Sequence, residues 1–223
     1  MTPPLKLLAL DTATDACSVA LHVDGAIAQR HEIAPQRHTQ LVLPMVRALC
    51  AEAGIGLAQL DAIAVGIGPG AFTGVRVATA IAQGLAYAHD LPVLAISTLA
   101  ALAQGGYRLT GIRTQLATLD ARRHELYWAC YEADAEGIVR AVDAERVTAA
   151  TALALPAAAA WRAVGTGWLG YAPAMRDAWP ELGPLPLLYP EAQDVATLGV
   201  AELRAGRAIA AAALAPTYLR APV

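Results

Sequence analysis

The chain has 223 residues, which is enough for one domain or two small lobes with a sizeable hydrophobic core. Hydrophobic residues make up 57% of it and charged residues 16%, a balance that excludes an intrinsically disordered protein. The formal net charge of -3 excludes a generally basic surface. We therefore expect no strong binding of nucleic acid by the isolated chain, and only shared or indirect contacts with any RNA.

The cysteines and the apolar segments bear on the cellular compartment. Cys17, Cys50 and Cys130 are odd in number and widely spaced, which argues against a disulfide framework and a zinc knuckle. Asp11 and Asp15 interrupt the first apolar segment too early for a signal peptide. No uninterrupted apolar stretch reaches the ~20 residues that a membrane span needs. We expect a cytoplasmic protein with reduced core cysteines and no membrane segment.

The first part of the chain predicts a meander of three strands followed by alternating helices and strands. Asp24-Gly25 is a strong hairpin signal between the second and third apolar runs. Pro44 either kinks the first turn of the first helix or delays its regular part, and Gly54 offers a left-handed stop. We expect strands over residues 5–10, 17–23, 26–33, 61–67 and 92–96, and helices over 39–53, 73–89 and 98–104.

The remainder predicts a second meander and a smaller lobe. Gly105-Gly106 is the expected boundary, so the first lobe covers residues 1–105 and the second covers 106–193. A C-terminal helix at about 194–220 is expected to pack back on the first lobe. The alanine-rich residues 149–160 are compatible with a helix or a connector. We expect strands over residues 115–119, 125–131, 138–142 and 161–165, irregular segments around the prolines from Pro173 to Pro190, and a helix over 195–205.

Three segments taken together indicate a family. They are LALDTATDACSVAL at 8–21, GIGPGAFTGVRVA at 66–78 and LDARRHELYWACY at 119–131, and the ending PTYLR at 216–220 agrees with them. In this order and at these separations they resemble the TsaB (YeaZ) family. The GPGxFTG pattern is shared with the catalytic paralogue TsaD. The resemblance implies an α/β, two-lobed actin/sugar-kinase/Hsp70-like (ASKHA) fold, with each lobe of ribonuclease-H-like topology.

The missing histidine pair favours TsaB over TsaD. TsaD-type proteins hold a metal through His-x-x-x-His on the helix after the opening meander, because residues four apart share one helical face. Here Val42 lies four residues after His38, and the places of the two histidines fall on Gln36 and Gln40. Amides are poor substitutes for imidazole. We therefore predict no metal ligands and no catalytic residues in this chain.

Asp11 and the glycine-rich loop form a candidate cofactor site. Asp11 ends the first strand, where kinases of this superfamily place an acidic residue near the magnesium of the nucleotide. Gly68, Gly70 and Gly74 lie between a strand and a helix N-terminus, where backbone donors can bind an anion. The alternatives are a turn stabilised by Asp11 and close helix packing at the glycines. We expect that the chain requires no cofactor and that any binding of ATP or ADP is weak.

The resemblance also implies a partner surface on the two helices of the first lobe. TsaB proteins pair with TsaD, or with themselves, through these helices. The residues predicted to form this surface are Leu43, Val46, Arg47, Val77, Ile81 and Leu85. The expected function is that of an accessory subunit, itself not an enzyme, which binds and activates a TsaD-type subunit during threonylcarbamoyladenosine modification of the tRNA adenine beside the anticodon.

The resemblance names further partners and leaves rivals open. A TsaE-type ATPase is expected to join the pair, with a TsaC-type synthase and tRNA as indirect partners, and a homodimer is expected in isolation. The rivals are an independent ATP-binding kinase-like enzyme, a metallopeptidase and a homodimeric regulatory protein. Arg122 and Arg123 with Tyr127 and Trp128 also predict a small basic and aromatic patch for RNA or another subunit, or else an ordinary solvated turn followed by a core strand.

Overall fold

The structure is a computed structural model that describes residues 5–156, 161–178 and 183–220. The chain forms two compact units. The first comprises Met1–Thr98 and Glu191–Thr217, and the second comprises Leu99–Pro190 and Tyr218–Val223. The division after Thr98 falls earlier in the chain than the expected boundary at Gly105. The alanine-rich tract extends into residues 157–160, which lie outside the described residues.

The sheet of the first unit has the strand order β3-β2-β1-β4-β5. Its first three strands form an antiparallel meander, and β4 and β5 run parallel to β1. Asp24 and Gly25 have positive φ angles of 51° and 95°, which confirms the predicted tight hairpin. The strands are β1 (Lys6–Asp11), β2 (Ala16–Val23), β3 (Ala26–Ile33), β4 (Ala62–Gly66) and β5 (Val93–Ile96).

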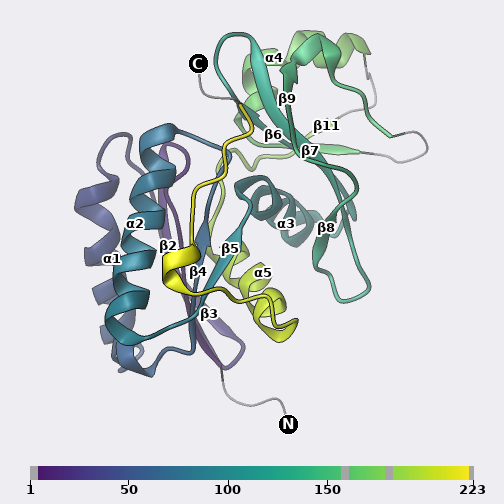
Figure 1. The fold of residues 1–223 in the computed structure, drawn as a ribbon. Helices are drawn as coiled ribbons and strands as arrows, with labels where there is room; N and C mark the ends of the chain where they lie inside the picture. Colours follow the sequence, from purple (N-terminus) through teal and green to yellow (C-terminus); the bar gives the residue numbers. More distant parts are fainter. Residues whose placement is uncertain (1–4, 157–160, 179–182, 221–223) are drawn as a thin grey trace. The chain divides into compact units, whose positions relative to one another are not determined.

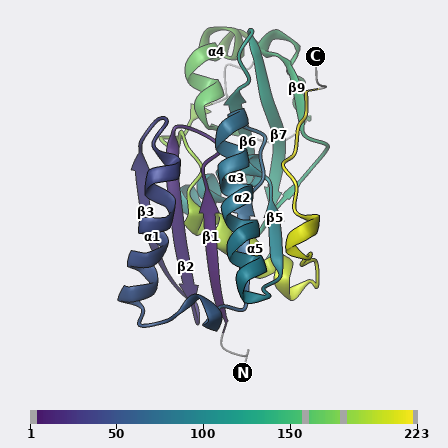
Figure 2. The same cartoon turned by 60° about the vertical axis from the view of Figure 1, so that its left-hand side comes forward.

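Three helices cover the two faces of this sheet (Figures 1 and 2). Helices α1 (His38–Glu52) and α2 (Phe72–His89) lie together on one face, and α5 (Ala192–Arg204) lies on the other. Helix α1 begins at His38 with Pro44 inside it, so of the two alternatives for Pro44 the delayed start of the helix is wrong. Gly54 ends it with φ 65°, as predicted.

The core of the first unit explains why these helices stay on the sheet. Apolar residues four apart on α1 and α2 lie on one helical face and pack against the strands. The C-terminal segment adds Leu214 to this core, and Gln83 on α2 donates a hydrogen bond of 2.8 Å to the Leu214 carbonyl. Part of α2 is therefore covered by this unit's own C-terminal segment.

The second unit repeats the connectivity of the first. Strands β6, β7 and β8 form an antiparallel meander, β10 is parallel to β6, and β11 is parallel to β10, while β9 also pairs with β7. Two such units confirm the α/β ASKHA fold with ribonuclease-H-like lobes. The strands are β6 (Thr114–Asp120), β7 (Glu125–Ala133), β8 (Val139–Ala141), β9 (Arg146–Ala149), β10 (Arg162–Val164) and β11 (Gly183–Pro184).

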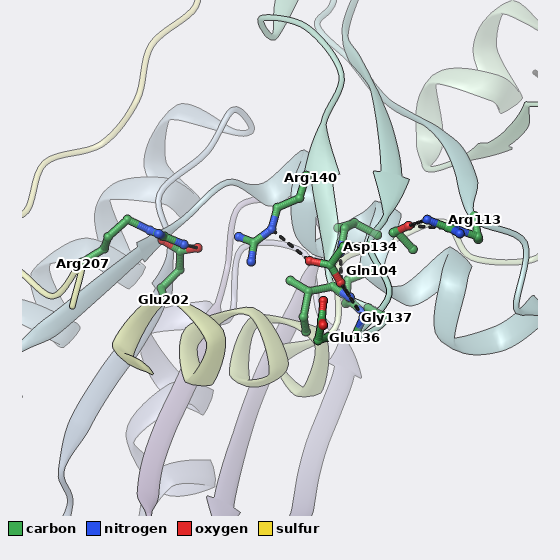
Figure 3. A network of polar contacts seen from close by, with 11 residues as sticks. Gln104, Arg113, Asp134, Glu136, Gly137, Arg140, Glu202 and Arg207 are labelled. Carbon is green, nitrogen blue, oxygen red and sulfur yellow. Dashed lines mark hydrogen bonds and ion pairs between the residues drawn. The ribbon is translucent and has the colours of Figure 1, made fainter. Parts of the chain in front are cut away.

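Helix α3 (Thr98–Thr110) carries the chain into the second unit. Gln104 donates a hydrogen bond of 2.9 Å to the Gly137 carbonyl and accepts one of 3.0 Å from the Val139 amide. The same hairpin is closed by Asp134, which accepts a hydrogen bond of 2.8 Å from the Ile138 amide and pairs with Arg140 at 3.3 Å (Figure 3). These contacts fix α3 to the β7–β8 turn.

Several sequence predictions for the second half are wrong. The Gly105-Gly106 pair lies inside α3 and does not end it. A Cβ at Gly106 would overlap Gln115 and Val164, so close packing accounts for this glycine. Strand β9 and helix α4 (Thr166–Ala178) were not predicted, and Pro173 lies inside α4. The last helix ends at Arg204, well before residue 220, and the described residues after it include the 3-10 turn η3 (Ala211–Ala213).

None of the helices in the described residues is long and apolar enough to cross a membrane. The three cysteines are free and buried, as the sequence predicts.

Candidate functional site

Asp11 is a fully buried carboxyl group at the C-terminal end of β1. Its Oδ1 accepts a hydrogen bond of 2.8 Å from the Ala13 amide, and its Oδ2 accepts one of 3.3 Å from the Thr98 hydroxyl. Burial raises the pKa of Asp11 to about 7, because desolvation outweighs the two hydrogen bonds, which lower it. Asp11 therefore exchanges a proton near neutral pH, in a place closed to solvent.

The glycine-rich loop after β4 packs directly on the turn that follows β1. A Cβ at Gly66 would overlap the Asp11 carboxylate, one at Gly70 would overlap the Ala13 carbonyl, and one at Gly74 would overlap the Thr12 carbonyl. The Ala71 amide donates a hydrogen bond of 2.7 Å to the Ala13 carbonyl. Only residues without a side chain allow this approach, so close packing accounts for all three glycines.

Gly68 holds the loop to the start of α3. Its φ is 101°, a conformation that residues with a Cβ rarely adopt. Its amide donates to the Thr98 hydroxyl at 3.2 Å, and its carbonyl accepts from the Thr98 amide at 2.9 Å. The Thr98 hydroxyl thus connects Gly68 to Asp11.

The structure brings the four predicted cofactor residues, Asp11, Gly68, Gly70 and Gly74, into one neighbourhood. Thr12 and Thr98 belong to it as well, and sequence reasoning missed them as site residues. Thr98 lies far from the other residues along the chain, and no sequence signal marks it. Gly66, the first residue of the motif at 66–78, also contacts Asp11 and was not predicted as a site residue. The binding of ATP or ADP at this site stays a prediction.

The places of the two TsaD histidines carry glutamines in this chain. Gln36 has a left-handed backbone with φ 64° and precedes α1, whereas Gln40 lies in the first turn of α1. Both side chains are exposed. Among the described residues, no group of three or more histidine, cysteine, aspartate or glutamate side chains could hold a metal ion.

The predicted partner face divides into accessible and buried residues. Leu43 and Arg47 on α1 are exposed, and Val77, Ile81 and Leu85 on α2 are half-buried. Val46 is only 2% exposed and packs in the core, because the α1 stripe that contains it faces the sheet. Its assignment to the partner face is therefore wrong.

Small residues on helix α2 that could let another helix approach were predicted at Ala78, Ala82 and Gly84, but Ala78 and Ala82 are buried in the core and only Gly84 of the three is exposed. Ala80, Gly84 and Ala88 are exposed at spacings of four, which places them on one side of the helix. A Cβ at Gly84 would meet nothing within 4 Å. Tyr87 beside them is 85% exposed.

Comparison with known proteins matches these features to one family. The family model described as "TsaD: tRNA N6-adenosine threonylcarbamoyltransferase" matches residues 28–166. The chain is 39% identical to the Escherichia coli "tRNA threonylcarbamoyladenosine biosynthesis protein TsaB", over 97% of this chain and 95% of that protein. It is 50% identical to a Haemophilus influenzae protein of the same name, over 56% of this chain and 53% of that one.

The chain belongs to the TsaB (YeaZ) family. Two solved structures from Pseudomonas aeruginosa agree with this membership. "YeaZ" superimposes with a TM-score of 0.90 at 44% identity, over 96% of this chain and 100% of that one. An uncharacterized protein with similarity to peptidase YEAZ gives a TM-score of 0.91 at 45% identity, covering 97% of this chain and 100% of that chain. The match to the TsaD family model fits the paralogy that the shared glycine loop implies.

Proposed function

We propose that this chain is a non-catalytic accessory subunit for the threonylcarbamoyladenosine modification of the tRNA adenine next to the anticodon, and that it binds and activates a TsaD-type catalytic subunit. The observation that carries the proposal is the nearly full-length match to a protein named for threonylcarbamoyladenosine biosynthesis. The surface proposed to bind that subunit is the side of α1 and α2 that carries Leu43, Arg47 and the exposed residues of α2, called here the α1–α2 face.

The α1–α2 face suits a helical partner. The exposed small residues Ala80, Gly84 and Ala88 permit a close approach of a second helix, since the side chains at a contact determine the distance between helix axes. The half-buried Ile81 and Leu85 border them and supply apolar area. A TsaD-type subunit and a second copy of the chain would compete for this surface.

The remaining partners follow from the family. A TsaE-type ATPase joins the pair, a TsaC-type synthase supplies the threonylcarbamoyl adenylate, and the assembly works in the cytoplasm on tRNA. The chain alone forms a homodimer and requires no cofactor. Any binding of ATP or ADP at Asp11 and the glycine loop is weak, because the turn after β1 fills the space beside the loop.

Reconstitution tests the proposal. The reaction contains tRNA, ATP, threonine, bicarbonate and the TsaC-, TsaD- and TsaE-type subunits, with and without this chain, and threonylcarbamoyladenosine is detected by mass spectrometry. Product is expected only in the presence of the chain. Unchanged product without the chain would contradict the accessory role and would make the independent ATP-binding enzyme the next hypothesis to test.

A pair of matched substitutions tests the face itself. Gly84→Arg places a bulky side chain on the exposed side of α2, so binding to the TsaD-type subunit should weaken at least ~10-fold while the fold is kept. Gly170→Arg is the control, because Gly170 is also an exposed helical glycine with nothing within 4 Å, but lies on α4 in the second unit. Equal effects of the two changes in a calorimetric titration would exclude the α1–α2 face.

A further inference from the structure

The turn between β6 and β7 has an unusual backbone. Arg122, Arg123 and His124 have φ angles of 62°, 55° and 64°, all in the left-handed region that residues with a Cβ rarely adopt. All three side chains are exposed. Unfavourable backbone conformations persist only where the surroundings enforce them, and they are concentrated at functional sites.

Three elements of the second unit hold the turn in this conformation. From within the hairpin, Asp120 Oδ1 accepts a hydrogen bond of 2.7 Å from the Arg122 amide, and the Ala121 amide donates to the Glu125 carbonyl at 2.9 Å. From α4, the Tyr171 hydroxyl donates to Asp120 Oδ1 at 3.4 Å. From the C-terminal segment, Arg220 donates to the Ala121 carbonyl at 3.1 Å and pairs with Glu125.

The held turn exposes two arginine side chains and one histidine side chain. The Arg122 side chain is 84% exposed, although it also pairs with Asp120 at 3.3 Å. The two carboxylates beside the turn, Asp120 and Glu125, are both engaged by arginines. Ala121 and Leu126 on either side are buried. The turn is therefore a locally positive surface with a constrained backbone, on a chain whose net charge is -3.

For Trp128 the structure agrees with the alternative of a core strand after the turn and not with an aromatic patch. Trp128 is 1% exposed, because it packs in the core and donates a hydrogen bond of 2.8 Å to the Thr148 hydroxyl, so it is not available at the surface. Tyr127 is half-buried. Tyr218, two residues before the anchoring Arg220, is 50% exposed.

We propose that the Arg122–His124 turn binds the phosphodiester backbone of the tRNA substrate. This inference rests on the proposed function and replaces the indirect RNA contact expected from net charge. Guanidinium groups form bidentate hydrogen bonds with phosphate oxygens, and phosphate contacts position an RNA without reading its bases. An RNA backbone is favoured over a protein surface because the turn exposes no apolar centre of the kind that protein interfaces have.

Salt-dependent binding of an unmodified tRNA transcript to the full chain tests this inference. Each arginine–phosphate contact adds about one to the slope of log affinity against log salt concentration. The double variant Arg122→Gln/Arg123→Gln should therefore lower the slope by about two and weaken binding at low salt at least ~10-fold. The control Arg30→Gln/Arg37→Gln removes the same charge from exposed residues of the first unit and should leave both values unchanged.

Each other outcome overturns the inference. The inference is wrong if the wild-type chain does not bind tRNA at low salt. It is also wrong if both double variants lose tRNA affinity equally, because net charge alone would then explain the binding. Unchanged RNA binding with weaker capture of the TsaD-type or TsaE-type subunit by the Arg122→Gln/Arg123→Gln chain would assign the turn to an acidic protein surface. Failure of the proposed function is separate, because it is measured by product in the reconstituted reaction and not by binding to the isolated chain.

Discussion

The turns after the first strands of the two units occupy the same topological position and have opposite characters. Asp11 ends β1 and Asp120 ends β6, and each accepts a hydrogen bond from the amide two residues later, at 2.8 Å and 2.7 Å. Asp11 is fully buried under the glycine loop, whereas the Asp120 side chain is 31% exposed beside Arg122, Arg123 and His124. One local motif thus takes part in core packing in the first unit and forms a solvent-facing turn in the second.

The difference arises from what packs on each turn. In the first unit, Gly66, Gly70 and Gly74 bring a loop and a helix N-terminus against the backbone of Thr12 and Ala13. In the second unit, the Tyr171 hydroxyl of α4 donates to the Asp120 side chain, and the Thr166 hydroxyl accepts from the Asp120 amide. Long-range packing, and not the turn sequence, decides whether the aspartate becomes a buried acid or a surface anchor.

Filling the space above the first turn should destabilise the protein. Gly74→Ala would place a methyl group against the Thr12 carbonyl, which belongs to the backbone and cannot move aside, so the free energy of unfolding should fall by about 3 kcal/mol. Gly84→Ala on the same helix meets nothing and should raise it by about 0.5–1 kcal/mol. Urea unfolding measures both, and a neutral Gly74→Ala would refute the packing explanation.

The second effect concerns the pH dependence of stability. Because the pKa of Asp11 is raised from 3.8 to about 7 on folding, the folded chain binds more protons than the unfolded chain between these values. Its stability should therefore decrease as the pH rises through this window, by up to about 4 kcal/mol. Above the folded pKa, the full penalty of the buried charge remains.

Asp11→Asn isolates this contribution. The asparagine keeps an acceptor for the Ala13 amide and does not titrate. The free energy of unfolding of the variant, relative to that of the wild type, should therefore be larger at pH 8 than at pH 5. Urea unfolding at both pH values gives the difference. A difference independent of pH would show that Asp11 is not protonated in the folded chain. Loss of nucleotide binding in the variant would instead favour the cofactor prediction.

The smallest effect is expected at the second turn. Arg123→Gly removes the unfavourable contact of a Cβ at φ 55°, which should raise the free energy of unfolding by up to about 1 kcal/mol, whereas Arg123→Ala keeps the Cβ and should give no gain. Thermal unfolding compares the two variants. If glycine is no better than alanine, the left-handed backbone costs little and the comparison of the two turns loses its energetic basis.

The sequence by itself determined the local features of this protein and its family. Apolar spacing predicted α1 and α2, and Asp24-Gly25 and Gly54 marked a hairpin and a helix end, because these signals act between residues near each other in the chain. The three motifs together indicated the TsaB family. The strand pattern also predicted the meander of each lobe.

Only the tertiary structure decided which residues are accessible and why the glycines occur. Val46 has the same spacing as its neighbours and is nevertheless buried, and Pro173 lies inside a helix despite its poor propensity. Thr98 meets Asp11 across a long stretch of chain, and the left-handed form of Arg122–His124 depends on α4 and Arg220. These outcomes depend on contacts between distant segments, which local propensity and spacing do not encode.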